Sequence, residues 1–192
     1  MSKIKELTWE HHKNAERQEF AKLLISGKIH PEFYATYLWN QHKKYDLLEA
    51  MAAPHGIFQE VGDIRRKTAI EEDILELWKK DGQPKLVPST YEYITHMREL
   101  MQDRDRLIAH VYVLYMGDLS GGQMIKKKIP GQGRMYEFEG DTSEIKDRIR
   151  AIVTDDMAEE AKWVFDSSTK LFQELMELDC ERYLESSDTV SE

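Results

Sequence analysis

The sequence is poor in the residues that cross-link small secreted proteins or interrupt helices. It contains one cysteine, Cys180, with five prolines and ten glycines among 192 residues. A lone cysteine cannot form an internal disulfide and fits a reducing compartment, so a cytoplasmic location is expected. The N-terminus lacks the apolar core of a secretory signal, and no apolar run approaches the ~20 residues of a membrane span. The composition therefore argues against secretion and against a membrane-spanning protein.

Basic residues are also fewer than acidic residues, 27 against 36. The formal net charge is −9, and residues 155–192 account for it, because they hold twelve acidic residues against three basic ones. The remaining part of the chain carries 24 of each sign. Nucleic-acid-binding proteins usually have a basic excess, so no nucleic-acid partner is expected. The run Lys126–Lys128 is ordinarily explained as a solvated helix face, but it would also suit docking of an acidic protein.

Apolar residues recur with helical spacing along most of the chain. Prolines and glycines stand mostly between these stretches, and no strand pair or internal repeat is evident. The segment Ser89-Thr90-Tyr91-Glu92 has the form of a capping box that begins a helix. The expected helices cover residues 3–25, 31–54, 62–80, a stretch from 89, 104–128, a short one from 141 and 155–185, with a loop at 129–142. This pattern predicts one all-α domain over residues 1–185, followed by a polar, disordered tail at 186–192.

The segment GDLSGGQ places three glycines inside the expected helix 104–128. Gly117 and Gly121 are four positions apart and share a helix face, with Gly122 beside them. Close packing of another helix is the ordinary explanation for such glycines. The third glycine, together with the polar Asp118 and Ser120 in an apolar helix, favours instead a bare face for a flat ligand. Asp118 would then hold ordered water in the space that the missing side chains leave.

A histidine near the N-terminus suggests what that ligand is. A lone histidine is more often a core or surface residue, but His12 and Glu16 are spaced so that the carboxylate can accept from Nδ1–H and leave Nε2 free for a metal. Ala15 leaves room beside the ring, and His11 points elsewhere. The sequence contains no HExxH, no CxxC and no clustered His, Asp and Glu set. One histidine and a glycine-faced helix suit haem, which brings four nitrogen ligands of its own.

The segments HKNAE and AHVYVLYMGDLSGGQMIKKK together resemble the haem oxygenase family. The resemblance extends from about Lys5 to Leu178, and the polar C-terminus is similar to the soluble bacterial, plastid or phage members. It implies a helical bundle with haem b sandwiched between a proximal and a distal helix. It also implies cleavage of haem, driven by O2 and a reductant, to biliverdin, carbon monoxide and Fe2+, with the α position as the expected site of attack.

The resemblance assigns roles to individual residues. His12 is the proximal iron ligand and Glu16 its hydrogen-bond partner. On the distal side it assigns the haem face to Gly117 and Gly121, with Gly122 completing that flexible stretch, and the water network to Asp118 and Tyr45. It assigns the haem propionates to Lys5, Tyr112, Lys146 and Arg150, and packing against haem to Phe165.

Three residues depart from the family pattern. Trp9 stands where another basic propionate contact is common, Leu114 replaces a frequent arginine, and Ser168 replaces an asparagine. The last two changes would reshape the distal water chain without removing Asp118. Because the sequence holds no flavin or nicotinamide motif, electrons must come from outside. The resemblance implies reduced ferredoxin or another external donor, with Lys126–Lys128 as the docking patch, and it allows a downstream bilin reductase as a partner.

Two other functions are compatible with parts of this pattern. A non-degrading haem-binding or haem-transfer protein would need His12 but not Asp118. A helical interaction protein would use the glycines only for tight packing and would bind no haem. Addition of haemin separates the last possibility from the other two, because it predicts no Soret band.

Overall fold

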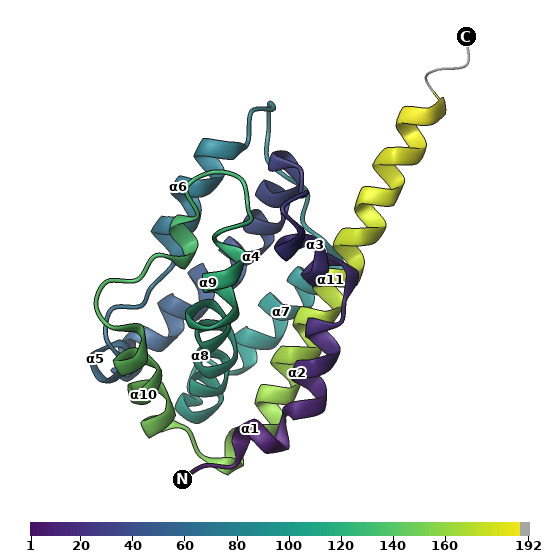
Figure 1. Cartoon of the computed structure of the whole chain (residues 1–192). Coiled ribbons are helices and arrows are strands. Elements are labelled where there is room, and N and C mark those ends of the chain that lie inside the picture. The colour runs from purple at the N-terminus through teal and green to yellow at the C-terminus, as the bar shows by residue number, and fades with distance from the viewer. Residues whose placement is uncertain (189–192) are drawn as a thin grey trace.

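The computed structural model describes the backbone of residues 1–188 and the side chains of residues 1–179. Every regular element in this part of the chain is helical, which confirms the all-α prediction (Figure 1). The α-helices are α1 (Ile4–Leu7), α2 (Trp9–Glu16), α3 (Glu19–Ser26), α4 (Pro31–Ala52), α5 (Ile57–Val61), α6 (Lys67–Leu77), α7 (Pro88–Glu99), α8 (Arg104–Leu119), α9 (Gly121–Ile125), α10 (Thr142–Ile152) and α11 (Ala158–Asp188). Three short 3₁₀ helices accompany them, η1 (Ala53–His55), η2 (Arg134–Tyr136) and η3 (Asp155–Met157).

The longest helices surround α8 and position it. Helix α4 packs against α6, α7 and α8, and α11 packs against α2, α3, α7 and α8. In Figure 1, α2 runs beside α11 on one side of the molecule, while α8 and α9 lie in its middle. Helix α10 covers α8 and also contacts α5. Helix α2, which carries His12, and helix α8, which carries Gly117, therefore share α11 as a common support.

The N-terminal segment is three helices, not the single helix expected over residues 3–25. The first break is at Thr8, whose hydroxyl donates to the carbonyl of Ile4 at 2.7 Å and competes with the helical ladder. The second is at Gln18, whose backbone is extended (ψ 144°). Helix α3 ends at Gly27, which has a left-handed φ of 75° that favours glycine. The apolar stripe continues through the breaks, so periodicity alone could not locate them.

The expected helix over residues 62–80 was also wrong at its start. Gly62 adopts φ 95° and ψ 170° and ends α5, and α6 begins only at Lys67. The proposed capping box was wrong as well, because α7 begins one residue earlier, with Pro88 in the first turn and no side-chain cap. The backbone N–H of Ser89 instead donates to Glu174 on α11, at 2.9 Å.

The segment 129–142 is only partly a loop. It contains η2, whose Met135 and Tyr136 are buried in the core. The C-terminal helix continues to Asp188, beyond its expected end at residue 185. The disordered tail predicted at 186–192 lies, for residues 189–192, outside the described residues.

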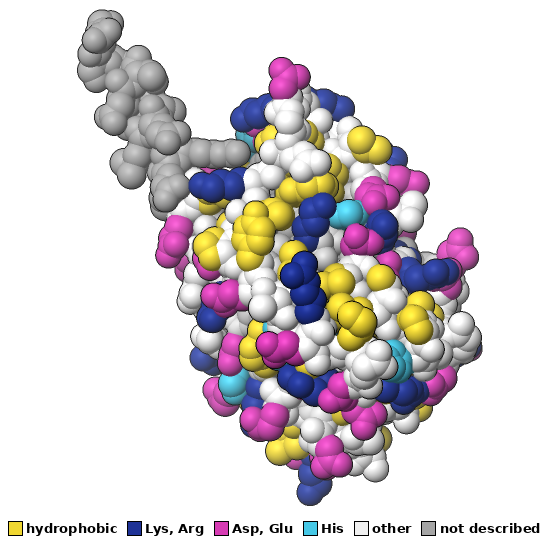
Figure 2. Space-filling model, turned by 180° about the vertical axis from the view of Figure 1, so that it is seen from behind, with side chains coloured by type: hydrophobic (Ala, Val, Ile, Leu, Met, Phe, Trp, Pro, Cys, Tyr) yellow, Lys and Arg dark blue, Asp and Glu magenta, His cyan; other side chains and the backbone are white. Residues whose placement is uncertain are grey.

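The surface mixes charges of both signs. Figure 2 shows the face opposite to that of Figure 1, where Lys and Arg alternate with Asp and Glu around patches of hydrophobic side chains. Among the described residues, no helix combines the length and apolar character that crossing a bilayer requires.

Candidate active site

A buried carboxylate and a buried tyrosine form the centre of the candidate site. The hydroxyl of Tyr45 on α4 donates to Oδ2 of Asp118 on α8, at 2.5 Å, and both side chains are buried. Burial raises the pKa of Asp118 from its usual 3.8 to about 7, although the bond from Tyr45 and the charges of Arg66 and Lys44 lower it. The carboxyl can therefore hold or release a proton near neutral pH.

The glycine segment breaks the helix directly after this pair. Ser120 takes φ −113° and ψ −88°, so α8 ends at Leu119 and α9 starts at Gly121. The amide of Gln123 bridges the break, because it donates to the carbonyl of Asp118 at 3.1 Å and to that of Tyr136 at 3.0 Å. The bend that the glycines made possible is thus fixed by a side chain from the following turn.

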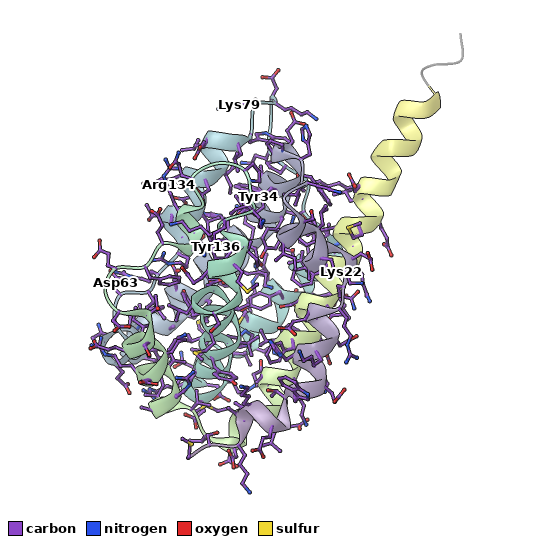
Figure 3. All side chains as sticks on the ribbon, viewed as in Figure 1. Lys22, Tyr34, Asp63, Lys79, Arg134 and Tyr136 are labelled. Atoms are coloured by element: carbon purple, nitrogen blue, oxygen red, sulfur yellow. The ribbon has the colours of Figure 1, made fainter. Side chains whose placement is uncertain are left out.

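The three glycines divide into two kinds. Gly117 and Gly121 are exposed, and a Cβ added at either would have no other group within 4 Å. Gly122 is buried, and a Cβ there would lie 2.5 Å from the ring of Tyr136. Figure 3 shows Tyr136 in the interior, near Tyr34. Gly122 therefore serves close packing within the flexible stretch, whereas Gly117 and Gly121 present bare backbone.

His12 on α2 is the half-buried histidine predicted as the iron ligand. Its Nε2 lies 3.2 Å from Oε1 of Glu16, and Glu16 also pairs with Lys13 at 2.9 Å. The expectation that Nδ1 would face Glu16 is corrected. The χ2 torsion of histidine is soft, so rotation of the ring is what would bring Nδ1 to the carboxylate. The His12 ring meets the edge of Phe165 on α11, with centroids 5.5 Å apart.

The neighbouring histidine is held elsewhere. Nδ1 of His11 lies 2.7 Å from Oδ1 of Asp166, which anchors α2 to α11. This leaves His12 as the histidine of the pair beside Phe165. A partner for His11 was not expected from the sequence, because Asp166 lies 155 positions away.

Only some of the residues predicted to contact the propionates lie close together. Tyr112 on α8 is half-buried, which raises its pKa, while the nearby charge of Arg150 on α10 and the hydroxyl of Thr8 lower it. Arg150 also pairs with Asp147, at 2.7 Å. Lys146 lies one turn before Arg150 on α10 and is half-buried. Lys5 is exposed on α1, one turn before Thr8.

The three departures from the family pattern have structural roles. Leu114 is buried in the core, and the hydroxyl of Ser168 donates to the carbonyl of Val164 in its own helix, at 3.1 Å. The Trp9 ring lies against His12, with centroids 5.7 Å apart, and carries the ammonium of Lys13 over its face. None of these three side chains brings a charge to the site.

A second polar cluster, invisible in the sequence, lies between α7, α8 and α11. Oε1 of Glu160 accepts from Nε2 of His96 at 2.5 Å and of His110 at 2.7 Å, and Oε2 accepts from Arg106 at 2.8 Å. Burial opposes ionisation of Glu160, but these three bonds outweigh it and lower the pKa of the carboxyl to about 2. Within the described side chains, this is the one group of three with the spacing of a metal site. Because the carboxylate is already saturated by donors, we interpret the cluster as a structural tie.

A surface pocket is lined by none of the residues predicted to contact haem. It has a volume of about 720 Å³ and opens between α6, α9 and the segment around η2. Its charged lining is internally paired, as between Arg65 and Asp63 and between Lys126 and Glu137. We assign no function to it.

Comparison with known proteins identifies the fold and then the family. The structure matches a haem oxygenase from Leptospira interrogans with a TM-score of 0.76 and 29% identity, over 88% of this chain and 96% of that one. It also matches the cyanobacterial heme oxygenase-1 of Synechocystis, solved in complex with heme, with a TM-score of 0.80 over 95% and 96% of the two chains. At 24% identity the second match shows the fold alone. The fold thus defines the class of single-domain helical proteins to which these oxygenases belong.

The sequence comparison is more specific. The family model described as heme oxygenase matches residues 1–178. A heme oxygenase from Rhodella violacea is 30% identical over 90% of this chain and 85% of its own length. The chain belongs to the haem oxygenase family.

Proposed function

We propose that this protein binds haem b as its substrate and opens it, with O2 and external electrons, to biliverdin, carbon monoxide and Fe2+. The proposal rests on two open surfaces, one on α2 and one at the junction of α8 and α9; α2 and α8 both pack against α11. The half-exposed ring of His12 lies on one side, and the bare backbone at Gly117 and Gly121 lies on the other, with the buried Asp118–Tyr45 pair behind it.

The residues present fit a haem group. His12 would bind the iron through Nε2, and Glu16, whose Oε1 lies 3.2 Å from that nitrogen in this structure, would hold the ring through Nδ1 after the ring rotates. Phe165 would pack beside the plate, and the missing side chains at Gly117 and Gly121 would admit it close to the backbone. Bound haem and O2 supply the oxidative chemistry, and the protein orients them.

Asp118 would transfer, through ordered water, the proton that this chemistry needs. Its pKa of about 7 lies near the operating pH, which is the condition for efficient proton transfer. Tyr45 donates to one carboxylate oxygen and leaves the other to order water toward the glycine face. No histidine is needed on this side.

Basic residues would set the rotation of the haem and hence the carbon attacked. Tyr112 and Arg150 lie close together, and Lys146 is on the same face of α10, so one propionate would be held there. Lys5 would hold the other propionate from α1. We infer attack at the α position from the family alone.

Electrons would come from reduced ferredoxin or another external donor. Lys127 and Lys128 are exposed just after α9, whereas Lys126 is paired with Glu137 at 2.8 Å. The proposed docking patch therefore consists of Lys127 and Lys128. A bilin reductase that takes the product remains a proposed partner, and a cytoplasmic location a proposed setting.

The test combines haemin with ferredoxin, its reductase and NADPH, and follows the Soret band and the product spectrum. We expect the Soret band to disappear and biliverdin to form. Asp118→Ala should still bind haemin but form biliverdin about 10²-fold more slowly, within the range of a lost proton-transfer group. A wild-type Soret band that persists through the assay would show a non-degrading haem-binding protein.

A further inference from the structure

Helix α4 carries a lysine in an unusual place. Lys44 is 1% exposed, and within the described residues its Nζ makes no hydrogen bond to the protein. The ammonium lies over the ring face of Tyr93 on α7, with Nζ 4.9 Å from the ring centre. Lysine is almost never fully buried unless it is paired, and a buried ammonium without partners destabilises a fold. Packing alone does not explain its presence.

The surroundings of Lys44 connect it to Asp118. The next residue, Tyr45, donates to Asp118, and the charges of Lys44 and Asp118 attract each other across the interface of α4 and α8. On the opposite side, the hydroxyl of Tyr93 lies 2.7 Å from Nδ1 of His110, whose pKa the charge of Lys44 helps to lower. Lys44 therefore lies between the candidate site and the structural cluster at Glu160.

The ionisation states of the two groups are coupled. Burial lowers the pKa of Lys44 from 10.5 to about 8, and the attraction of Asp118 opposes this. The ammonium thus persists at neutral pH, where the carboxyl of Asp118 is close to half-ionised. Arg66 also favours the carboxylate, but its guanidinium is already bonded to the carbonyls of Ile64 and Glu137.

An ammonium has three donors, and water is the partner that can still satisfy them where no protein acceptor is present. Leu114, on the same helix as Asp118, is apolar and supplies no such donor. Among the described residues, Lys44 and Arg66 are the buried cations whose charges favour the Asp118 carboxylate, and of the two it is Lys44 that has no protein acceptor.

We propose that Lys44 is a positioning residue for the reaction: its buried ammonium holds the water next to Asp118 and favours the carboxylate form that orients that water. The inference rests on the proposed haem cleavage for its functional consequence, but the coupling between Lys44 and Asp118 can be measured without haem.

The test compares Lys44→Met with Lys43→Met. Both changes remove an ammonium that lies over an aromatic ring, since Nζ of Lys43 is 3.8 Å from the ring centre of Trp39, but Lys44 is the buried one, and its charge acts on Asp118. In the haem-free protein, the Asp118 carboxyl is titrated by carbon-13 NMR and assigned by the signal lost in Asp118→Asn. We expect Lys44→Met to raise the pKa of Asp118 by about 1 unit or more, and Lys43→Met to leave it in place.

The second measurement is haem degradation against pH, with haemin affinity and melting temperature as controls. We expect Lys44→Met to bind haemin normally, to melt no lower than wild type, and to degrade haem about 10-fold more slowly or worse at pH 7, with its pH profile displaced upward. An unchanged Asp118 pKa, or an unchanged rate and profile, would overturn the proposal and leave only packing on Tyr93. If wild type degrades no haem while the NMR coupling holds, the proposed function fails and the Lys44–Asp118 coupling stands.

Discussion

Asp118 combines deep burial with a single strong donor, and this combination makes the protein's stability depend on pH. The neutral carboxyl is favoured in the folded state, because its pKa is about 7 there and 3.8 as the reference for the unfolded chain. The associated stability is fully present below pH 3.8 and is lost as the pH rises to about 7.

Asp118→Asn should remove this dependence. At pH 8 the asparagine can still accept from Tyr45 and carries no buried charge, so we expect the variant to be more stable than wild type, by at most about 4 kcal/mol. At pH 4 the two proteins should be nearly equal. Urea denaturation at both pH values measures the difference. A variant less stable than wild type at pH 8 would show that the carboxylate is better solvated than its burial indicates.

At the level of elements, the junction of α8 and α9 shows how one glycine-rich segment performs two tasks. Gly121 leaves open space, whereas Gly122 admits the ring of Tyr136. Gly122→Ala should therefore destabilise the fold by roughly 1–3 kcal/mol, since the ring cannot move freely in the core. Gly121→Ala should preserve or slightly raise stability, because alanine favours helix more than glycine does.

Thermal melting and haemin titration together test this division. Gly121→Leu should melt like wild type but bind haemin more weakly, because its side chain projects over the bare backbone. Gly122→Ala should show the reverse order of effects. If both variants lost stability alike, the two glycines would share one packing role.

The helices also show which structural features could be predicted from the sequence. The apolar period predicted the helical class and most of the chain's helices. The spacing of His12 with Glu16 and of Gly117 with Gly121 predicted a metal-binding histidine and a bare helix face, and the family resemblance placed them on opposite sides of haem. The breaks at Thr8 and Ser120 depend on a hydroxyl bond and on one residue's backbone angles, to which periodicity is blind. Lys44 could have been found, since it shares the buried stripe of Tyr37, Gln41 and Leu48. The cluster at Glu160 could not, because its members are joined only by the packing of α7, α8 and α11.

For the whole molecule, the distribution of charge determines where an acidic electron donor could dock. The net charge is −9, so an acidic partner needs a local exception to the general repulsion. Lys127 and Lys128 provide one beside the glycine segment, next to the C-terminal end of α3, where the side chain of Lys128 approaches Gly27.

Charge reversal tests whether Lys127 and Lys128 form the docking patch. Lys127→Glu combined with Lys128→Glu should slow reduction by ferredoxin about 10-fold or more at low ionic strength and weaken its salt dependence, while dithionite reduces both proteins equally. The matched control reverses Lys79 and Lys85, two exposed lysines in the segment between α6 and α7, of which Figure 3 labels Lys79. Equal slowing in the control would indicate a global charge effect and would remove the patch assignment.

The support of α2 by α11 has a consequence for synthesis. The ribosome makes the histidine helix α2 early and α11, its main support, last, so α2 lacks most of its packing surface until Phe165 has emerged. Contacts this distant in sequence form late in folding. The nascent protein therefore cannot take up an iron porphyrin in its finished geometry, and a cell that makes this chain must complete nearly all of it before any substrate is held.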